Sequence, residues 1–172
     1  MIIEKDLIYF LNTNLVNYHK YMFSENVYKY ISDNSEDIID FNFDKTTTTT
    51  TITKYTIKSP FPNFLHYLFK NTKYIIEDKS IWDFTNNTCK VTNHSSFHKL
   101  LDTSFESIYS YTELDNNLLK VNVKYIFTIN KIILPKKFIK SRFISKMMKT
   151  HNERVDLLKK FIDMEENKSF KN

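Results

Sequence analysis

The final third of the chain changes its hydrophobic period at one point, and this change limits the possible folds more than any other feature. From residue 118 to residue 133 apolar and polar side chains alternate, as they do in a strand with one buried face. The apolar positions of this segment are Leu119, Val121, Val123, Tyr125, Phe127 and Ile129. After Pro135 apolar side chains recur every three or four residues, which indicates a helix with one apolar side. That side consists of Ile139, Phe143, Met147, His151, Val155, Leu158 and Ile162. A half-buried strand followed by such a helix predicts a helix that lies across a sheet.

The residues before this point favour strands in most places and helices in two. Asn14 suits the N-cap of a helical pattern over 14–31, and Ser24 can begin a second helix within it. A short helix is expected over 63–70. Strands are expected over 6–11, 38–43, 46–57, 73–84, 90–97 and 105–113. The third of these begins with a threonine tract, which we interpret as an edge-type strand. With a final helix over 135–165, these elements predict an α+β fold in which a curved seven-stranded antiparallel sheet wraps around a long C-terminal helix.

Composition limits both the size of the core and the kinds of site. The 172 residues are 41% hydrophobic and 16% aromatic, which is enough for one folded domain over 1–172, with its core over 6–166 and a polar tail over 167–172. The chain contains no glycine. Dinucleotide-binding and P-loop motifs need glycine where the backbone approaches phosphate, so this absence argues against most nucleotide-dependent enzymes. Asn, Asp and Pro must supply the tight turns.

Cysteine and hydropathy suggest where the protein works. Cys89 is the single cysteine, so an internal disulfide and a cysteine-based zinc site are excluded. We find no apolar run of signal-peptide length near the N-terminus and none of the about 18 residues that a membrane helix requires. We therefore expect a cytoplasmic protein, and we expect it to be a monomer.

The most unusual charge feature lies between Asn116 and Asn152, where basic residues occur without any Asp or Glu. The basic residues are Lys120, Lys124, Lys131, Lys136, Lys137, Lys140, Arg142, Lys146 and Lys149. Lys136, Lys137 and Lys140 fall in the first turns of the expected helix, where free N–H groups also favour anions. The simplest interpretation is a solvated face. An anionic membrane surface is the next alternative, and nucleic acid is the least favoured.

The histidines do not predict a metal site. His94 and His98 are four residues apart, but their segment has the pattern of a strand and a turn, which would hold the two rings too far apart for one ion. His151 interrupts the apolar side of the final helix. It is either a satisfied core histidine or a polar contact in a cavity.

No set of side chains predicts catalysis. Glu77, Asp78 and Asp83 lie in an expected strand beside Trp82, and we interpret them as the solvent-facing side of the sheet. Cys89 has no neighbouring histidine in the sequence that would activate it. We therefore expect a protein that is not an enzyme and that uses neither a cofactor nor a metal.

The order of elements resembles the START-like helix-grip superfamily, which includes START lipid-transfer domains, plant pollen-allergen ligand carriers and polyketide cyclases. The resemblance covers residues 6–164. Its most specific parts are the junction ILPKKFI at 133–139, after the alternating strand, and the segment IIEDKSIWDF at 75–84. Both are architectural signatures and not catalytic motifs. The resemblance implies a curved sheet wrapped around the terminal helix, with a cavity between them.

The residues supply suitable walls for such a cavity, and they could equally fill a solid core. The candidate ligand-binding residues are Trp82, Phe84, Tyr109, Tyr111, Val121, Val123, Tyr125 and Phe127 from strands, and Phe143, Met147 and Met148 from the helix. We expect the non-enzymatic binding or transfer of a hydrophobic small molecule, foremost a lipid or sterol. The alternative is a module without a pocket that docks through its basic 120–149 surface on an anionic membrane, a protein or nucleic acid. Cyclase-like chemistry is the third possibility.

Overall fold

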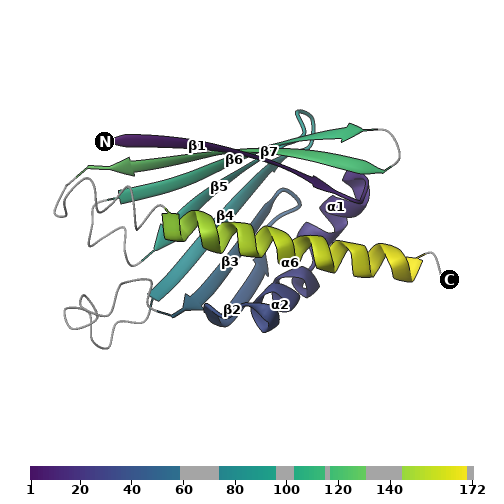
Figure 1. The fold of residues 1–172 in the computed structure, drawn as a ribbon, viewed down its shortest axis with the longest axis horizontal. Coiled ribbons are helices and arrows are strands. Elements are labelled where there is room, and N and C mark those ends of the chain that lie inside the picture. The colour runs from purple at the N-terminus through teal and green to yellow at the C-terminus, as the bar shows by residue number, and fades with distance from the viewer. Residues whose placement is uncertain (59–73, 96–102, 115–116, 131–144, 170–172) are drawn as a thin grey trace.

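The chain forms one seven-stranded antiparallel sheet with helices on one side of it (Figure 1). A computed structural model describes residues 1–58, 74–95, 103–114, 117–130 and 145–169. The elements are β1 (Ile2–Leu11), α1 (Leu15–Met22), α2 (Glu25–Asn34), β2 (Ile38–Lys45), β3 (Thr50–Ile57), β4 (Tyr74–Asp83), β5 (Thr88–Ser95), β6 (Thr103–Leu114), β7 (Leu118–Ile129) and α6 (Ser145–Ser169). This architecture confirms the predicted α+β fold.

The strand order is β1-β7-β6-β5-β4-β3-β2, so the first strand pairs with the last. Their register runs from Ile2 opposite Thr128 to Leu11 opposite Leu119. Since β1 and β2 are the two edges of the sheet, α1 and α2 carry the chain from one edge to the other (Figure 1). The strands β2 to β7 then follow one another as antiparallel neighbours. Helix α6 crosses the sheet on the side where α1 and α2 also lie.

Several strand boundaries differ from the prediction, and the starts of β1 and β3 have identifiable causes. Strand β1 begins at Ile2, four residues before the predicted start at residue 6, because β7 offers pairing along its whole length. Strand β3 begins at Thr50, because the preceding threonines form a turn in which the Thr47 amide donates to the Thr50 carbonyl at 3.2 Å. The interpretation of β3 as an edge strand is wrong, since it lies between β2 and β4.

The helices agree with the prediction where they are described. Asn14 caps α1, since its side-chain oxygen accepts from the Asn17 amide at 2.8 Å, and Ser24 caps α2 in the same way. Helix α6 continues to Ser169, beyond the predicted end at residue 165. The predicted helix over 63–70 and the predicted start of the final helix at Pro135 lie outside the described residues.

Asparagine replaces glycine where the backbone requires a positive φ. Asn87 has a φ of 50° and Asn117 a φ of 57°. This left-handed region is unfavourable for residues with a Cβ, but asparagine tolerates it better than most others. At the turn after β4 the Asp83 carboxylate also accepts from the amides of Thr85 and Asn86, at 3.0 and 3.1 Å. These turns confirm that polar residues supply the bends.

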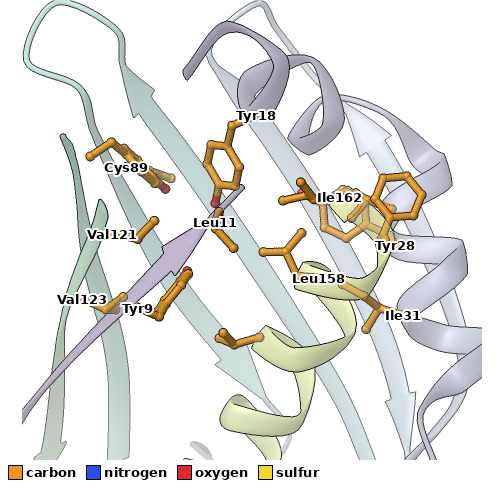
Figure 2. Close-up of a cluster of buried hydrophobic side chains, with 14 of the residues drawn as sticks. Tyr9, Leu11, Tyr18, Tyr28, Ile31, Cys89, Val121, Val123, Leu158 and Ile162 are labelled. Carbon is orange, nitrogen blue, oxygen red and sulfur yellow. The ribbon is translucent and has the colours of Figure 1, made fainter. Parts of the chain in front are cut away.

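The core lies between the inner face of the sheet and α6. All six residues predicted to form the apolar face of β7 are buried. From α6 the buried residues are Val155, Leu158, Phe161 and Ile162. Figure 2 shows Leu158 and Ile162 facing Tyr28 and Ile31 of α2, with Leu11 of β1 beside them. The predicted apolar side of the final helix is therefore confirmed over its described part.

A polar clasp joins the end of α6 to α1. The Glu166 carboxylate accepts hydrogen bonds from Thr13 Oγ1 at 2.6 Å, from Asn17 Nδ2 at 3.1 Å and from the Tyr21 hydroxyl at 3.1 Å. Burial and the neighbouring Glu166 carboxylate raise the pKa of Tyr21 to about 12. Because all three donors come from α1 or the residue just before its N-cap, the clasp fixes the C-terminal half of α6 on the sheet.

Candidate ligand-binding site

A cavity of about 240 Å³ lies between the inner face of the sheet and α6. Among the described residues, every strand and helix except β2 contributes to its lining. An apolar cavity of about 150 Å³ is enough to hold benzene, so this cavity accommodates a compact ring compound. The core is therefore not solid, and the question that the sequence left open is answered in favour of a cavity.

The cavity exists because one row of the sheet carries small side chains. Ser80 of β4 pairs with Val91 of β5, which pairs with Ser107 of β6, and all three line the cavity. The row on one side contains Trp82 and Tyr109. Side chains on neighbouring strands stand side by side, so this row leaves more room beneath α6 than the row with the larger side chains.

The structure brings together six of the residues predicted to bind a ligand. The six that line the cavity are Trp82, Tyr109, Tyr111, Tyr125, Phe127 and Met148. Val121 and Val123 share the inner face but are buried in the core beside β1 and are not among the lining residues (Figure 2). Phe84 is 42% exposed and contacts the ring of His19 at 4.8 Å instead. Phe143 and the side chain of Met147 lie outside the described part. Binding by any of these residues stays a prediction.

One end of the cavity is aromatic. Tyr111 lies 5.2 Å from Tyr18 and is stacked on Trp82 at 5.7 Å, measured between ring centroids. Burial raises the pKa of both tyrosines, so their hydroxyls are neutral at physiological pH. Burial also raises the pKa of the Cys89 thiol to about 12. This end therefore presents flat, uncharged surfaces.

The other end of the cavity is polar and lies toward the start of α6. Asn93 of β5 donates to the Asp78 carboxylate of β4 at 2.6 Å. The Arg154 guanidinium of α6 lies 4.0 Å from the second Asp78 oxygen and 4.6 Å from the centroid of the Tyr55 ring. His151 lies one turn before Arg154 and meets the Tyr125 ring at 4.8 Å. All six side chains line the cavity.

Burial governs the charges at this polar end. It raises the pKa of Asp78, although Arg154 and the hydrogen bond from Asn93 oppose the shift. Burial, and then the nearby Arg154 charge, lower the pKa of His151 to about 4. His151 is therefore neutral at physiological pH. Within the described residues, its Nε2 atom and the Nε atom of Arg154 are buried and have no hydrogen-bond partner.

Sequence reasoning named a polar contact in a cavity as one of two roles for His151, which does line the cavity, but it missed the other members of this cluster. The interpretation of Asp78 as part of the solvent-facing side is wrong, because Asp78 lines the cavity together with Trp82. The signal was available, since residues 78 and 82 differ by an even number and must share a face of the strand. Glu77 does face outward as predicted, and it pairs with Lys54 at 3.0 Å. Arg154 was not singled out, although it lies one turn after His151 on the predicted apolar side.

The basic stretch is only partly described. Lys124 pairs with Glu4 at 3.0 Å, and Lys149 pairs with Glu153 at 3.6 Å. The three lysines predicted to form an anionic-surface site, Lys136, Lys137 and Lys140, lie outside the described residues. Of the helices that are described, none is both long and apolar enough to span a bilayer. No three His, Cys, Asp or Glu side chains of the described segments form a group that could hold a metal ion.

Several solved structures share the fold of this chain. The Zhui aromatase/cyclase from Streptomyces sp. R1128 has a TM-score of 0.68 at 4% identity, over 95% of this chain and 94% of that one. Norcoclaurine synthase from Thalictrum flavum, in complex with dopamine and hydroxybenzaldehyde, has a TM-score of 0.65 at 9% identity, over 94% of this chain and 87% of that one. Ara h 8.0201 has a TM-score of 0.64 at 10% identity, over 94% of this chain and 98% of that one.

No protein-family profile and no curated protein matches the sequence of this chain. The likeness to the solved structures therefore concerns the fold. It agrees with the strand order, with the first strand paired to the last, and with the long C-terminal helix across the inner face. On these grounds the chain has the START-like helix-grip fold.

Proposed function

We propose that this protein binds one compact, largely apolar molecule in the cavity between the sheet and α6. The observation that carries the proposal is the cavity of about 240 Å³ with an aromatic end and a polar end. Apolar walls with a few convergent polar groups are the usual design of small-molecule sites. Ser80 and Ser107 are among the lining residues, and their small side chains leave room for a ligand.

The volume favours a ligand smaller than the expected sterol or a two-chain lipid. Typical ligand pockets enclose about 300–1,000 Å³, and the cavity here lies just below that range. One or two rings, or a single short acyl chain, fit this space. A sterol or a two-chain lipid requires the cavity to widen. The norcoclaurine synthase structure, which holds dopamine and hydroxybenzaldehyde, supports the proposal because those molecules have one ring each.

The chain carries its own reporter for this test. Trp82 is the only tryptophan, it is 4% exposed and it lines the cavity. We expect a saturable change in tryptophan fluorescence when a two-ring hydrocarbon such as tetralin is added, and we expect native mass spectrometry to detect a complex of one ligand per chain. Absence of binding by both measurements, for tetralin and for a single-chain fatty alcohol, would remove the proposal.

A variant pair on one strand separates cavity binding from surface adsorption. Ser107→Leu places a larger side chain on the cavity floor, whereas Ser104→Leu places the same side chain on the outer face of β6. We expect Ser107→Leu to weaken tetralin binding by at least about 10-fold, because the ligand and the new side chain compete for one volume. Ser104→Leu should leave the dissociation constant unchanged. Equal effects of the two changes would place the ligand on the surface.

A second candidate function is proton transfer on the bound molecule, and the Asp78, His151 and Arg154 cluster favours it. Efficient general bases have a pKa near the working pH, whereas the pKa of His151 is about 4. Histidine with this pKa is a weak base, so binding remains the first proposal. The test is to incubate saturating ligand in deuterated water with the protein and with His151→Gln and to measure deuterium uptake by the ligand with mass spectrometry. Faster uptake with the unmodified protein than with His151→Gln would establish catalysis.

A further inference from the structure

Two residues of α6 that line the cavity each carry a buried polar atom with unused hydrogen-bonding capacity. Arg154 Nε and His151 Nε2 are buried, and neither has a hydrogen-bond partner among the residues that the structure describes. The two residues are one helical turn apart and both line the cavity, so the two atoms lie beside the same space. Buried polar groups in native proteins almost always have partners. A bound molecule that supplies a partner would complete this end of the cavity.

The charges around these atoms restrict what the partner can be. Asp78 already balances Arg154 at 4.0 Å, and His151 is neutral. The other charged lining residues are Asp37 and Lys58, which carry opposite charges. A ligand anion would add an unbalanced charge near Asp78, and a ligand cation would add one near Arg154, and burying such a charge is costly. An uncharged oxygen can accept from Arg154 without either cost.

We propose that Arg154 and His151 form an oxygen-recognition site, and that the ligand is an uncharged ring compound with a carbonyl or hydroxyl oxygen. This inference rests on the proposed function, and it names the chemistry that the cavity selects. The oxygen accepts a hydrogen bond from Arg154 Nε. The neutral His151 ring can donate to the same oxygen in the tautomer that carries its proton on Nε2, and in the other tautomer Nε2 can accept from a hydroxyl. The apolar body of the ligand then extends toward Tyr18, Trp82 and Tyr111 at the aromatic end.

Three probes with one ring system test this preference in the full chain. Tetralin has no oxygen, 1-tetralone has a ketone, and tetralin-2-carboxylate carries a negative charge at neutral pH. We expect 1-tetralone to bind at least about 10-fold more tightly than tetralin, and more tightly than the carboxylate. Equal affinities for tetralin and 1-tetralone would overturn the oxygen site while leaving the proposed function intact. Tighter binding of the carboxylate would also overturn it, because the site would then select anions. If no probe binds, both proposals fail together.

Variants then assign the preference to the two residues. The double change Asp78→Asn with Arg154→Met removes the donor without leaving a buried, unpaired carboxylate. It should abolish the preference for 1-tetralone while tetralin still binds. His151→Phe should reduce the preference in part. Lys149→Met is the matched control, because Lys149 lies on α6 and is not among the lining residues, and it should change neither affinity. A double variant that binds tetralin and keeps the full preference would overturn the assignment, as would one in which both affinities fall equally.

Discussion

Two asparagines adopt a backbone conformation that usually requires glycine, which this chain does not contain. Asn87, with a φ of 50°, lies in the turn between β4 and β5, and its carbonyl accepts from the Tyr111 amide at 3.0 Å. In most proteins glycine occupies such positions, because it has no Cβ to clash with the carbonyl. Here asparagine adopts this unfavourable backbone conformation, and hydrogen bonds with neighbouring residues stabilise the turn.

This strain can be measured by two substitutions at one site. Asn87→Ala should lower the free energy of unfolding by about 1 kcal/mol, because alanine tolerates a positive φ less well than asparagine. Asn87→Gly should change it by less than about 0.5 kcal/mol, because glycine adopts this backbone freely but gains entropy in the unfolded chain. Urea denaturation of both variants provides the comparison. Equal losses would show that the asparagine side chain matters and the backbone angle does not.

His151 should make stability depend on pH. The folded pKa of about 4 lies below the ordinary value of 6.5, so the unfolded chain binds a proton in this interval and the folded chain does not. Stability is therefore fully present above pH 6.5 and falls as the pH drops toward 4, by up to about 3 kcal/mol.

The comparison with His151→Gln isolates this effect, because glutamine does not titrate. The raised pKa of Asp78 acts with the opposite sign, but it is present in both proteins. Urea denaturation between pH 7 and pH 4 should show the difference between the two proteins changing by most of the stated amount. A constant difference across this range would contradict the prediction.

At the scale of elements, the position of α6 depends on different contacts along its length. Its C-terminal half is held by Glu166 and by buried apolar residues that meet α2 (Figure 2). Its described N-terminal half borders the polar end of the cavity, where Thr150 donates to Asp37 at 3.5 Å. The C-terminal half of α6 is therefore held more firmly than the described half that borders the polar end of the cavity.

Removing the clasp should lower the free energy of unfolding, and the loss should increase with the number of hydrogen-bond donors left without an acceptor. Glu166→Ala removes the acceptor of Thr13, Asn17 and Tyr21, and we expect a loss of about 2–3 kcal/mol in unfolding free energy. Glu165→Ala is the matched control, because Glu165 pairs with Lys168 at the surface. Such exposed pairs contribute about 0–1 kcal/mol. Similar losses in both variants, measured by urea denaturation, would mean that the clasp does not hold the helix.

The elements with a strong local pattern could be predicted, and those that depend on distant partners could not. The alternation of β7 and the apolar side of α6 appear in the sequence because each has one buried face along its length. The true start of β1 did not, because residues 2–5 are strand only through pairing with β7. The interior position of β3 follows from the sheet order, which no local pattern encodes.

Only the apolar part of the site could be predicted from the sequence. Aromatic residues on one face of a strand indicate a wall, and six of the eleven candidates do line the cavity. The cavity itself depends on Ser80, Val91 and Ser107 standing side by side, which requires the register of three strands. The polar end needs Asp78 and Arg154 to meet across the space between the sheet and α6, and their positions in the sequence are 76 residues apart (154 minus 78).

The molecule contains a cavity between the sheet and α6, so its free energy of unfolding should depend on whether a ligand is bound there. A ligand that binds only the folded state at 100 times its dissociation constant adds about 2.7 kcal/mol to the unfolding free energy. For a chain of this length each kcal/mol raises the melting temperature by about 2–4 °C.

We therefore expect saturating 1-tetralone to raise the melting temperature by about 5–10 °C in differential scanning calorimetry. The same ligand concentration should shift Ser107→Leu by at most about half as much, because a dissociation constant at least about 10-fold higher leaves no more than about 1.4 kcal/mol of this stabilisation. An equal shift in both proteins would show that the ligand stabilises the chain from outside the cavity.

During synthesis, β1 can pair with β7 only after β7 has been made. Residue 2 leaves the ribosome long before its partner, residue 128, has been made, and at about 5–20 residues per second the delay is roughly 6–25 s. During that time β1 has no neighbour along its length, and Ile2, Ile8 and Phe10, which remain exposed even in the finished sheet, are joined by the still uncovered Tyr9 and Leu11. Unpaired apolar strands are sites of aggregation. The nascent chain therefore exposes this apolar strand until β7 has been made.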